Sequence, residues 1–309
     1  MIRVTNTTIF DRITTQLSQQ QARLAETQEK ISTGRNFLRP SDAPDQVAAL
    51  DRLESTVRQT ERYSSNIGRI KDKLSLQELA ITSMNNDLTR AKELMVQGAN
   101  GTLNAASREA LAIELDSIYT NLIAIGNRKD VDGSYLFSGY VQDKAPFDAS
   151  KDPLVTPFSE FYAGNDEIQK ISVDDGYTIE AGMPGSRLYA GFESASGART
   201  DLFKVLRSAS EALKADDGAG MTTAIDDIDN ALTHINVRLA QVGSKMRTAE
   251  NQMSVLTDRS ATLEQIISQV EELDYISAVT ELKNQTLALQ AGQSSFAQIS
   301  NLSLFNYIK

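Results

Sequence analysis

Apolar residues follow a seven-residue repeat along much of the chain. The repeat runs through the N-terminal part, returns from Ile67 to Met95, recurs briefly from Leu111 to Ile125, and is longest from Ile225 to Val270. It slips near Asp274 and then resumes. A repeat of this kind gives each helix one apolar face that packs on partner helices. We therefore expect long helices that form an antiparallel bundle.

Residues 139–199 do not follow the repeat. Four of the six prolines lie between 146 and 184, and ten of the nineteen Phe and Tyr lie between 135 and 192. Short β-prone pieces, such as KISV and YTIE, are bounded by turns rich in Asp and Gly. The predicted fold is therefore mainly α, a long helical bundle with discontinuous N- and C-terminal halves and a small β-rich inserted domain.

The segment KISTGRNFLRPSDAPDQ, residues 30–46, interrupts the helical pattern near its start. Gly34 is a helix stop signal, and a new helix is expected to begin near Ser41 or Asp42, whose side chain can cap it. Pro44 suits the first turn of that helix. The expected domains are terminal arms at 1–40 and 275–309, a bundle body at 41–138 and 200–274, and the insertion at 139–199.

Each terminal arm carries an apolar stripe that it cannot cover by itself. Isolated helices of such length are marginal in water, so the stripes have to pack on each other or on neighbouring molecules. The expected assembly interface consists of Phe10, Ile13, Leu17, Leu24 and Ile31 together with Leu282, Leu289, Phe296, Ile299 and Leu302.

Composition narrows the possible functions. The net charge is -10, and such a chain is a poor match for nucleic acid or anionic membranes, whose binding needs clustered Lys and Arg. The sequence shows no apolar run of about 20 residues that would span a membrane and no apolar signal-peptide core near its start. We expect no membrane insertion and no cleaved secretion signal.

Side chains that carry chemistry are scarce. The chain has no Cys and one histidine, His234, which falls outside both apolar series of its helix and is expected to be a solvated surface residue. Asp130–Gly133 resembles a turn more than a calcium loop, because further oxygen ligands are missing. The aromatic residues of the insertion are expected to form a small core. The sequence predicts no catalytic residue, no metal and no cofactor.

Several segments in a fixed order resemble the flagellin family. The match covers roughly the first 140 and the last 110 residues. The segments are Leu24-Ala25, Ile31–Gly34 and Ser41–Pro44 near the start, Leu88–Asn100 with Arg90, Glu93, Leu94 and Gln97, and, near the end, Asp274, Ala278, Glu281-Leu282 and Leu289–Gly292.

One segment separates the branches of that family. Asp132–Gly139, followed by Pro146-Phe147, departs from the FNG-type segment of filament flagellins and is similar to members that join the hook to the filament. The resemblance implies an axial protein outside the cell, exported through the flagellar type III channel. Its expected partners are hook-associated protein 1, flagellin, further copies of itself in a ring or tube, and an export chaperone that holds the C-terminal segment. It also implies arms that are disordered in the monomer and helical after assembly.

Three alternatives stay open at this point. The chain could be a bulk filament flagellin, an unrelated secreted coiled-coil protein, or an enzyme whose insertion acts on glycans or peptides. A side hypothesis also follows from the resemblance. In flagellins, the segment that matches Leu88–Gln97 is contacted by a toll-like innate immune receptor, and Arg90, Leu94 and Glu114 match that pattern. The alternative is that these three residues serve packing.

Overall fold

The structure is a computed structural model that describes residues 2–141 and 143–305, with the side chains of residues 8, 10–141 and 143–298. By the contacts among its residues, the chain divides into two compact units. Unit 1 comprises residues 1–59 and 259–309, and unit 2 comprises residues 60–258. The two units are described separately.

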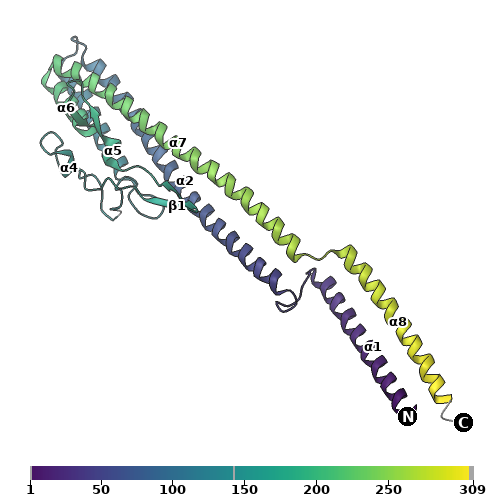
Figure 1. The fold of residues 1–309 in the computed structure, drawn as a ribbon. Coiled ribbons are helices and arrows are strands. Elements are labelled where there is room, and N and C mark those ends of the chain that lie inside the picture. The colour runs from purple at the N-terminus through teal and green to yellow at the C-terminus, as the bar shows by residue number, and fades with distance from the viewer. Residues whose placement is uncertain (1, 142, 306–309) are drawn as a thin grey trace. The chain divides into compact units, whose positions relative to one another are not determined.

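Helices dominate the described part of the chain (Figure 1). They are α1 (Ile2–Thr33), α2 (Pro44–Gly98), α3 (Ala105–Gly126), α4 (Phe158–Phe161), α5 (Gly185–Tyr189), α6 (Leu202–Ala215), α7 (Gly218–Glu271) and α8 (Tyr275–Phe305). The strands are β1 (Lys170–Asp174), β2 (Tyr177–Glu180), β3 (Ala190–Glu193) and β4 (Arg199–Asp201), which form two antiparallel pairs, β1 with β2 and β3 with β4. The prediction of a mainly α fold with a small β-containing insertion is confirmed.

Ion pairs show the direction in which the long helices of unit 2 pack. Lys71 of α2 pairs with Glu250 of α7 at 3.6 Å, and Lys92 of α2 pairs with Asp229 of α7 at 2.6 Å. Residue numbers rise along one helix as they fall along the other, so α2 and α7 run antiparallel, as expected.

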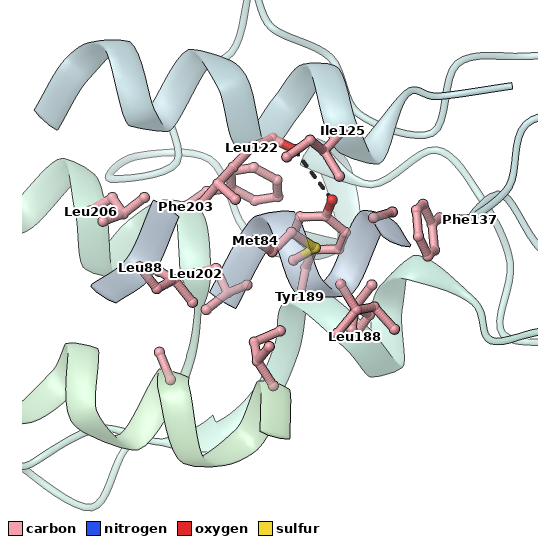
Figure 2. Packing of buried hydrophobic residues seen from close by; sticks show 14 of the residues in the cluster. Met84, Leu88, Leu122, Ile125, Phe137, Leu188, Tyr189, Leu202, Phe203 and Leu206 are labelled. Atoms are coloured by element: carbon pink, nitrogen blue, oxygen red, sulfur yellow. Dashed lines mark hydrogen bonds between the residues drawn. The ribbon is translucent and has the colours of Figure 1, made fainter. Parts of the chain in front are cut away.

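Unit 2 has one continuous hydrophobic core. Fully buried side chains come from all four of its longer helices, for example Leu88 of α2, Leu122 of α3 and Leu206 of α6 (Figure 2). Helix α7 contributes Ile228. Burial of one such side chain contributes about 1.5–3 kcal/mol. Unit 2 therefore buries, within one chain, the apolar surface that a stable domain requires.

The segment between α3 and α6 shares this core. The ring of Phe147 lies 4.5 Å from that of Tyr189 and 5.0 Å from that of Phe203, which belongs to α6. The Tyr189 hydroxyl donates to the carbonyl oxygen of Leu122 in α3 at 3.2 Å (Figure 2). The aromatic residues form a core, as predicted, but it is continuous with the core of the helices.

Polar side chains of the long helices hold the insertion through its backbone carbonyls. Gln77 of α2 is fully buried, and its Nε2 donates to the carbonyl oxygens of Leu136 at 2.9 Å and Met183 at 3.1 Å. Lys245 of α7 donates through Nζ to the carbonyl oxygen of Gly182 at 3.1 Å. These contacts bind two points of the segment between α3 and α6 to helices far away in the sequence.

The prediction that His234 is a solvated surface residue is wrong. Its Nε2 lies 3.1 Å from the carbonyl oxygens of both Arg187 and Leu188, and its ring centroid lies 5.2 Å from that of Phe192. Because both partners are carbonyl oxygens, Nε2 must carry the proton. Burial, followed by the charge of Arg238, lowers the pKa of His234. The insertion folds back on α7 and covers a position that the helical pattern alone leaves exposed.

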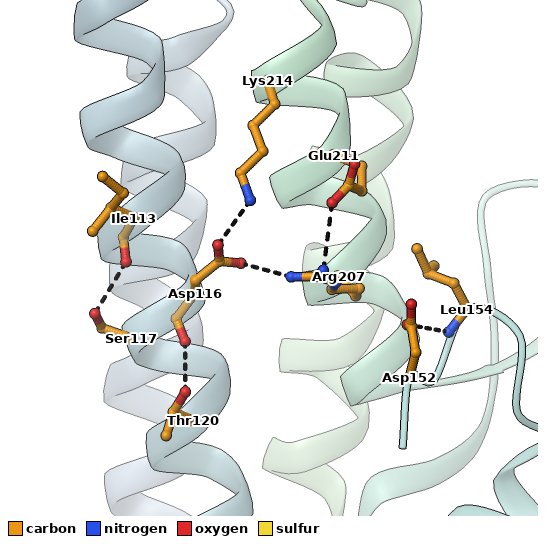
Figure 3. Close-up of polar contacts among 9 residues, drawn as sticks. All are labelled: Ile113, Asp116, Ser117, Thr120, Asp152, Leu154, Arg207, Glu211 and Lys214. Carbon is orange, nitrogen blue, oxygen red and sulfur yellow. Dashed lines mark hydrogen bonds and ion pairs between the residues drawn. The ribbon is translucent and has the colours of Figure 1, made fainter. Parts of the chain in front are cut away.

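A polar network links α3 to α6 on the surface of unit 2. Asp116 accepts a hydrogen bond from Lys214 Nζ at 2.9 Å and one from Arg207 Nη1 at 3.3 Å, and Glu211 pairs with Arg207 at 3.6 Å (Figure 3). Partial burial raises the pKa of Asp116, but the hydrogen bond and charge of Lys214 and the charge of Arg207 outweigh it. The pKa therefore lies below its usual value.

Candidate assembly interface

Unit 1 contains both terminal helices, and Figure 1 shows α1 in purple beside α8 in yellow. Helix α1 ends where the sequence predicts, at Gly34, whose N–H donates to the carbonyl oxygen of Lys30 at 2.8 Å. Gly34 has φ +72°, a left-handed conformation that favours glycine. A Cβ at this position would also lie 2.8 Å from the Tyr275 hydroxyl oxygen. The left-handed backbone is the main reason that this stop favours glycine, and any larger residue would also displace the Tyr275 hydroxyl.

The two interruptions of the helical pattern contact each other. The backbone N–H of Asn36 donates to the carbonyl oxygen of Glu271 at 2.9 Å, and that of Leu273 donates to the carbonyl oxygen of Gly34 at 2.9 Å. Arg35 adds an ion pair to Glu271 at 3.2 Å. The loop after α1 is thus bound to the turn between α7 and α8.

The helix starts on either side of this junction are capped differently. Helix α2 begins at Pro44, slightly later than the start near Ser41 or Asp42 that the sequence predicts, and Asp42 does not cap it. The Asp42 carboxylate instead accepts from the backbone N–H of Arg39 at 2.9 Å, so it stabilises the loop. Asp274 caps α8, accepting from the backbone N–H of Ile276 at 3.0 Å and of Ser277 at 3.2 Å. Hydrogen bonds from Ser277 are the main reason that the pKa of Asp274 lies below its usual value.

The apolar stripes of α1 and α8 meet within one chain. The rings of Phe10 and Phe296 pack edge to face, with centroids 5.6 Å apart. Further along, a Cβ on Gly292 would lie 3.1 Å from Leu17 Cδ2, so the absence of a side chain lets α8 approach α1 closely. The two helices run antiparallel, because Phe10 meets Phe296 while Gly34 at the other end of α1 meets the first residue of α8, Tyr275.

This seam is only half covered. Among the unit 1 side chains that the structure describes, only Thr27 and Ala278 are buried, with 8% and 6% of their surface exposed. The half-buried members of the predicted interface are Phe10, Ile13, Leu17, Leu24, Ile31, Leu282, Leu289 and Phe296, and the side chains of Ile299 and Leu302 lie outside the described residues. A pair of helices covers one side of each stripe, and the other side remains available to a neighbour.

A second apolar face of α8 was missed by the sequence analysis. It consists of Tyr275, Ile276, Val279 and Leu287, of which Ile276 is 83% exposed and Leu287 is 67% exposed. The sequence does contain a pattern that indicates this face. The four residues recur at helical intervals, and only Glu281 and Lys283 are charged between residues 275 and 305. Exposed apolar surface with few charges is typical of a surface that another chain covers.

The residues that match the receptor-contact pattern of flagellins lie in unit 2. Arg90 is exposed and donates through Nε to Glu114 at 2.7 Å and through Nη1 to Glu93 at 3.0 Å. Leu94 is fully buried in the core, so it is available for packing and not for a surface contact. Arg90 and Glu114 link α2 to α3 across the surface of unit 2.

The described residues lack the features of two other kinds of site. No group of three or more His, Cys, Asp or Glu side chains lies close enough together to hold a metal ion. None of the described helices combines the length and the apolar character needed to cross a membrane.

Family models account for both ends of the chain. The model of the bacterial flagellin N-terminal helical region matches residues 5–142, and the model of the C-terminal helical region matches residues 225–308. The chain belongs to the flagellin family. The interpretation as an unrelated secreted coiled-coil protein is therefore wrong.

The relatives that this chain resembles include both hook-associated proteins and flagellins. Flagellar hook-associated protein 3 of Escherichia coli is 28% identical over 91% of this chain and 92% of its own length. Flagellin of Bacillus subtilis is 24% identical over 87% of each chain. The solved structure of a putative flagellar hook-associated protein from Vibrio parahaemolyticus has the same fold, with a TM-score of 0.65 and 21% identity over 75% of this chain and all of that one. The chain is accordingly a structural protein of the flagellum.

Proposed function

We propose that this chain is the adaptor that joins the flagellar hook to the flagellin filament, placed between hook-associated protein 1 and the first layer of flagellin. The observation that carries the proposal is the contrast between its two units. Unit 2 has a complete core, whereas the seam between α1 and α8 in unit 1 is half covered. A chain built this way is suited to assembly through its ends. The likeness to hook-associated protein 3 over nearly its whole length favours the junction.

Apolar burial would hold the assembly together. Copies arranged side by side cover the open side of each seam and the outer face of α8, where Ile276 and Leu287 are exposed. Each half-buried apolar side chain that becomes fully buried contributes about 1 kcal/mol. The same residues in every copy contribute in the same way, so a ring or tube of copies gains stiffness from many equivalent contacts.

Export would precede this assembly. We propose passage through the flagellar type III channel to the outside of the cell. A chaperone would cover the C-terminal segment until then. The exposed apolar face of α8 supports this part of the proposal, because such a surface has to be kept from premature association.

The decisive experiment removes the gene from a flagellated bacterium that carries it. We expect hooks to remain intact, filaments to be lost and flagellin to be shed into the medium. Immunogold labelling of the complemented strain should then mark a narrow band at the base of each filament. Normal filaments on the deletion strain would contradict the proposal.

A bulk filament flagellin is the second candidate, and the likeness to the flagellin of Bacillus subtilis over 87% of both chains supports it. The two functions differ in self-assembly. A bulk flagellin polymerises alone into long filaments, whereas an adaptor forms short, bounded assemblies. Electron microscopy of the purified protein after seeding distinguishes them, and labelling along the entire filament would favour the bulk subunit.

A further inference from the structure

The insertion carries a groove that the proposed assembly through the ends does not use. Its walls are the loop before and at the start of α4 and the hairpin of β3 and β4, and its volume is about 540 Å³. An adjoining hollow of about 380 Å³ shares Phe158 and Ser186 with it and continues to Asp166. We call the two together the insertion groove. Its principal residues are Pro153, Val155, Phe158, Asp166, Arg199 and Lys204.

The charges of the insertion groove are separated. Arg199 and Lys204 line one end and Asp166 lines the other, with Glu167 next to it in the sequence, and all four side chains are exposed. None of the four takes part in an ion pair within the part of the chain that the structure describes. Asp201 lies at the cationic end, but its carboxylate is buried and caps α6 through the backbone N–H of Lys204 at 2.9 Å. The cations are therefore available to an acidic partner.

The centre of the groove is apolar and partly uncovered. Val155 is 82% exposed at the rim, and Phe158 is half-buried where the two hollows meet. An exposed apolar centre between charged ends has the composition of a protein-binding surface, in which apolar contacts supply affinity and charges set orientation.

We propose that the insertion groove binds the insertion of a neighbouring copy of this chain, with the acidic Asp166–Glu167 end of one copy seated at the Arg199 and Lys204 end of the next. Each copy offers one cationic and one acidic end, so the contact repeats head to tail from copy to copy. It adds a second kind of contact between copies to the contacts of the terminal helices. The inference rests on the proposed function, because it requires copies to lie side by side.

Cysteine cross-linking tests this contact cleanly, because the natural chain contains no Cys. Lys204→Cys and Asp166→Cys are placed in two separately tagged copies and expressed together in the deletion strain. Disulfide formation needs Cα atoms within about 7 Å, so it reports close approach. In flagella isolated from these cells and oxidised, we expect a mixed-tag dimer. The matched control is Ser208→Cys with Asp166→Cys, since Ser208 is exposed one turn further along α6 and does not line the groove. We expect at least fivefold less dimer there.

Two further measurements extend the test. One chain that carries both Lys204→Cys and Asp166→Cys should give trimers and longer ladders, and dimers alone would overturn the head-to-tail arrangement. Assembly of the Cys pair in 0.5 M NaCl should lower the yield about threefold, because the attraction between the two charges that remain, Arg199 and Glu167, is screened.

The outcomes separate the two proposals. Absence of the chain from isolated flagella would overturn the proposed function and this inference with it. Presence in flagella with no dimer above the Ser208→Cys control would overturn the inference alone. A disulfide to a different flagellar protein in place of a second copy would also overturn it.

Discussion

The substitution Leu289→Asp tests whether the seam between α1 and α8 carries assembly. Leu289 is half-buried in that seam. The matched control is Asn284→Asp, which adds the same charge to the same helix at an exposed position. Any difference between the two variants therefore reports the half-buried site, namely the lost apolar contact and the partial burial of the carboxylate, and not the change in net charge.

The size of the effect follows from burial. A fully buried leucine contributes about 1.5–3 kcal/mol, so a half-buried one contributes about 1 kcal/mol. Placing a carboxylate where only half of its surroundings are water adds about 1–2 kcal/mol. The total of about 2–3 kcal/mol per chain acts on a unit in which only Thr27 and Ala278 are buried among the described side chains. Asn284→Asp should change stability by less than about 0.5 kcal/mol.

Two measurements are needed. The thermal midpoint of the purified variants reports unit 2, which Leu289→Asp leaves intact, so we expect it to match that of the natural chain. The number of filaments per cell reports assembly, and we expect Leu289→Asp to lose most filaments while Asn284→Asp keeps them. Normal filament numbers with Leu289→Asp would refute the reasoning that the seam drives assembly.

Four further predictions address other parts of the chain. Limited proteolysis of the purified monomer should trim both ends towards about residues 40 and 280, because the arms have little burial before assembly; ends that resist protease would contradict this. Gln77→Leu should lower the free energy of unfolding by about 2 kcal/mol in urea titration, because the carbonyl oxygens of Leu136 and Met183 lose their donor. Asp116→Asn should lower stability by about 0.5 kcal/mol near pH 7, after allowing for its exposure to solvent. Because the folded-state pKa of Asp116 is lowered, its contribution is present above the unfolded pKa of about 4 and disappears as the pH falls through the folded value, so the two melting curves should converge as the carboxyl becomes protonated in the folded state as well. Because Leu94 is fully buried, we expect purified monomer not to stimulate reporter cells that carry a toll-like receptor; a response that Arg90→Ala weakens would instead support receptor contact through the exposed Arg90.

Local periodicity predicted the core of unit 2 well. Along α2, the seven-residue series places its members on the face that unit 2 covers. The residues of that series are Ile67, Leu74, Ile81, Leu88 and Met95, all of them fully buried. In the unit 2 part of α7, one of two predicted series is buried and the other is half-buried at the edge of the core, as Ile235 and Leu239 illustrate. Periodicity identifies the apolar face of a helix, and the partners decide how much of it is covered.

Polar residues were harder to assign for a physical reason. Gln77 and His234 bind backbone carbonyls of the insertion, which the chain brings to α2 and α7 only after the whole unit has folded. A carbonyl has no side-chain signature in the sequence, so neither partner could be recognised in advance. Leu94 is a different case. Its spacing from Leu88 and Ala91 indicates the buried face, and the resemblance to a receptor-contact pattern obscured that signal.

The arms and the body illustrate how one sequence pattern gives two physical outcomes. Leu88 in α2 and Leu17 in α1 both belong to seven-residue series, yet Leu88 is fully buried and Leu17 is half-buried. Helix α2 is covered by α3, α7 and the insertion, whereas α1 is covered by α8. Under the proposed function, neighbouring copies supply what is missing around α1. The terminal helices would then become stably ordered as the copies assemble, because the same half-exposed side chains stabilise the helices and the contacts between copies.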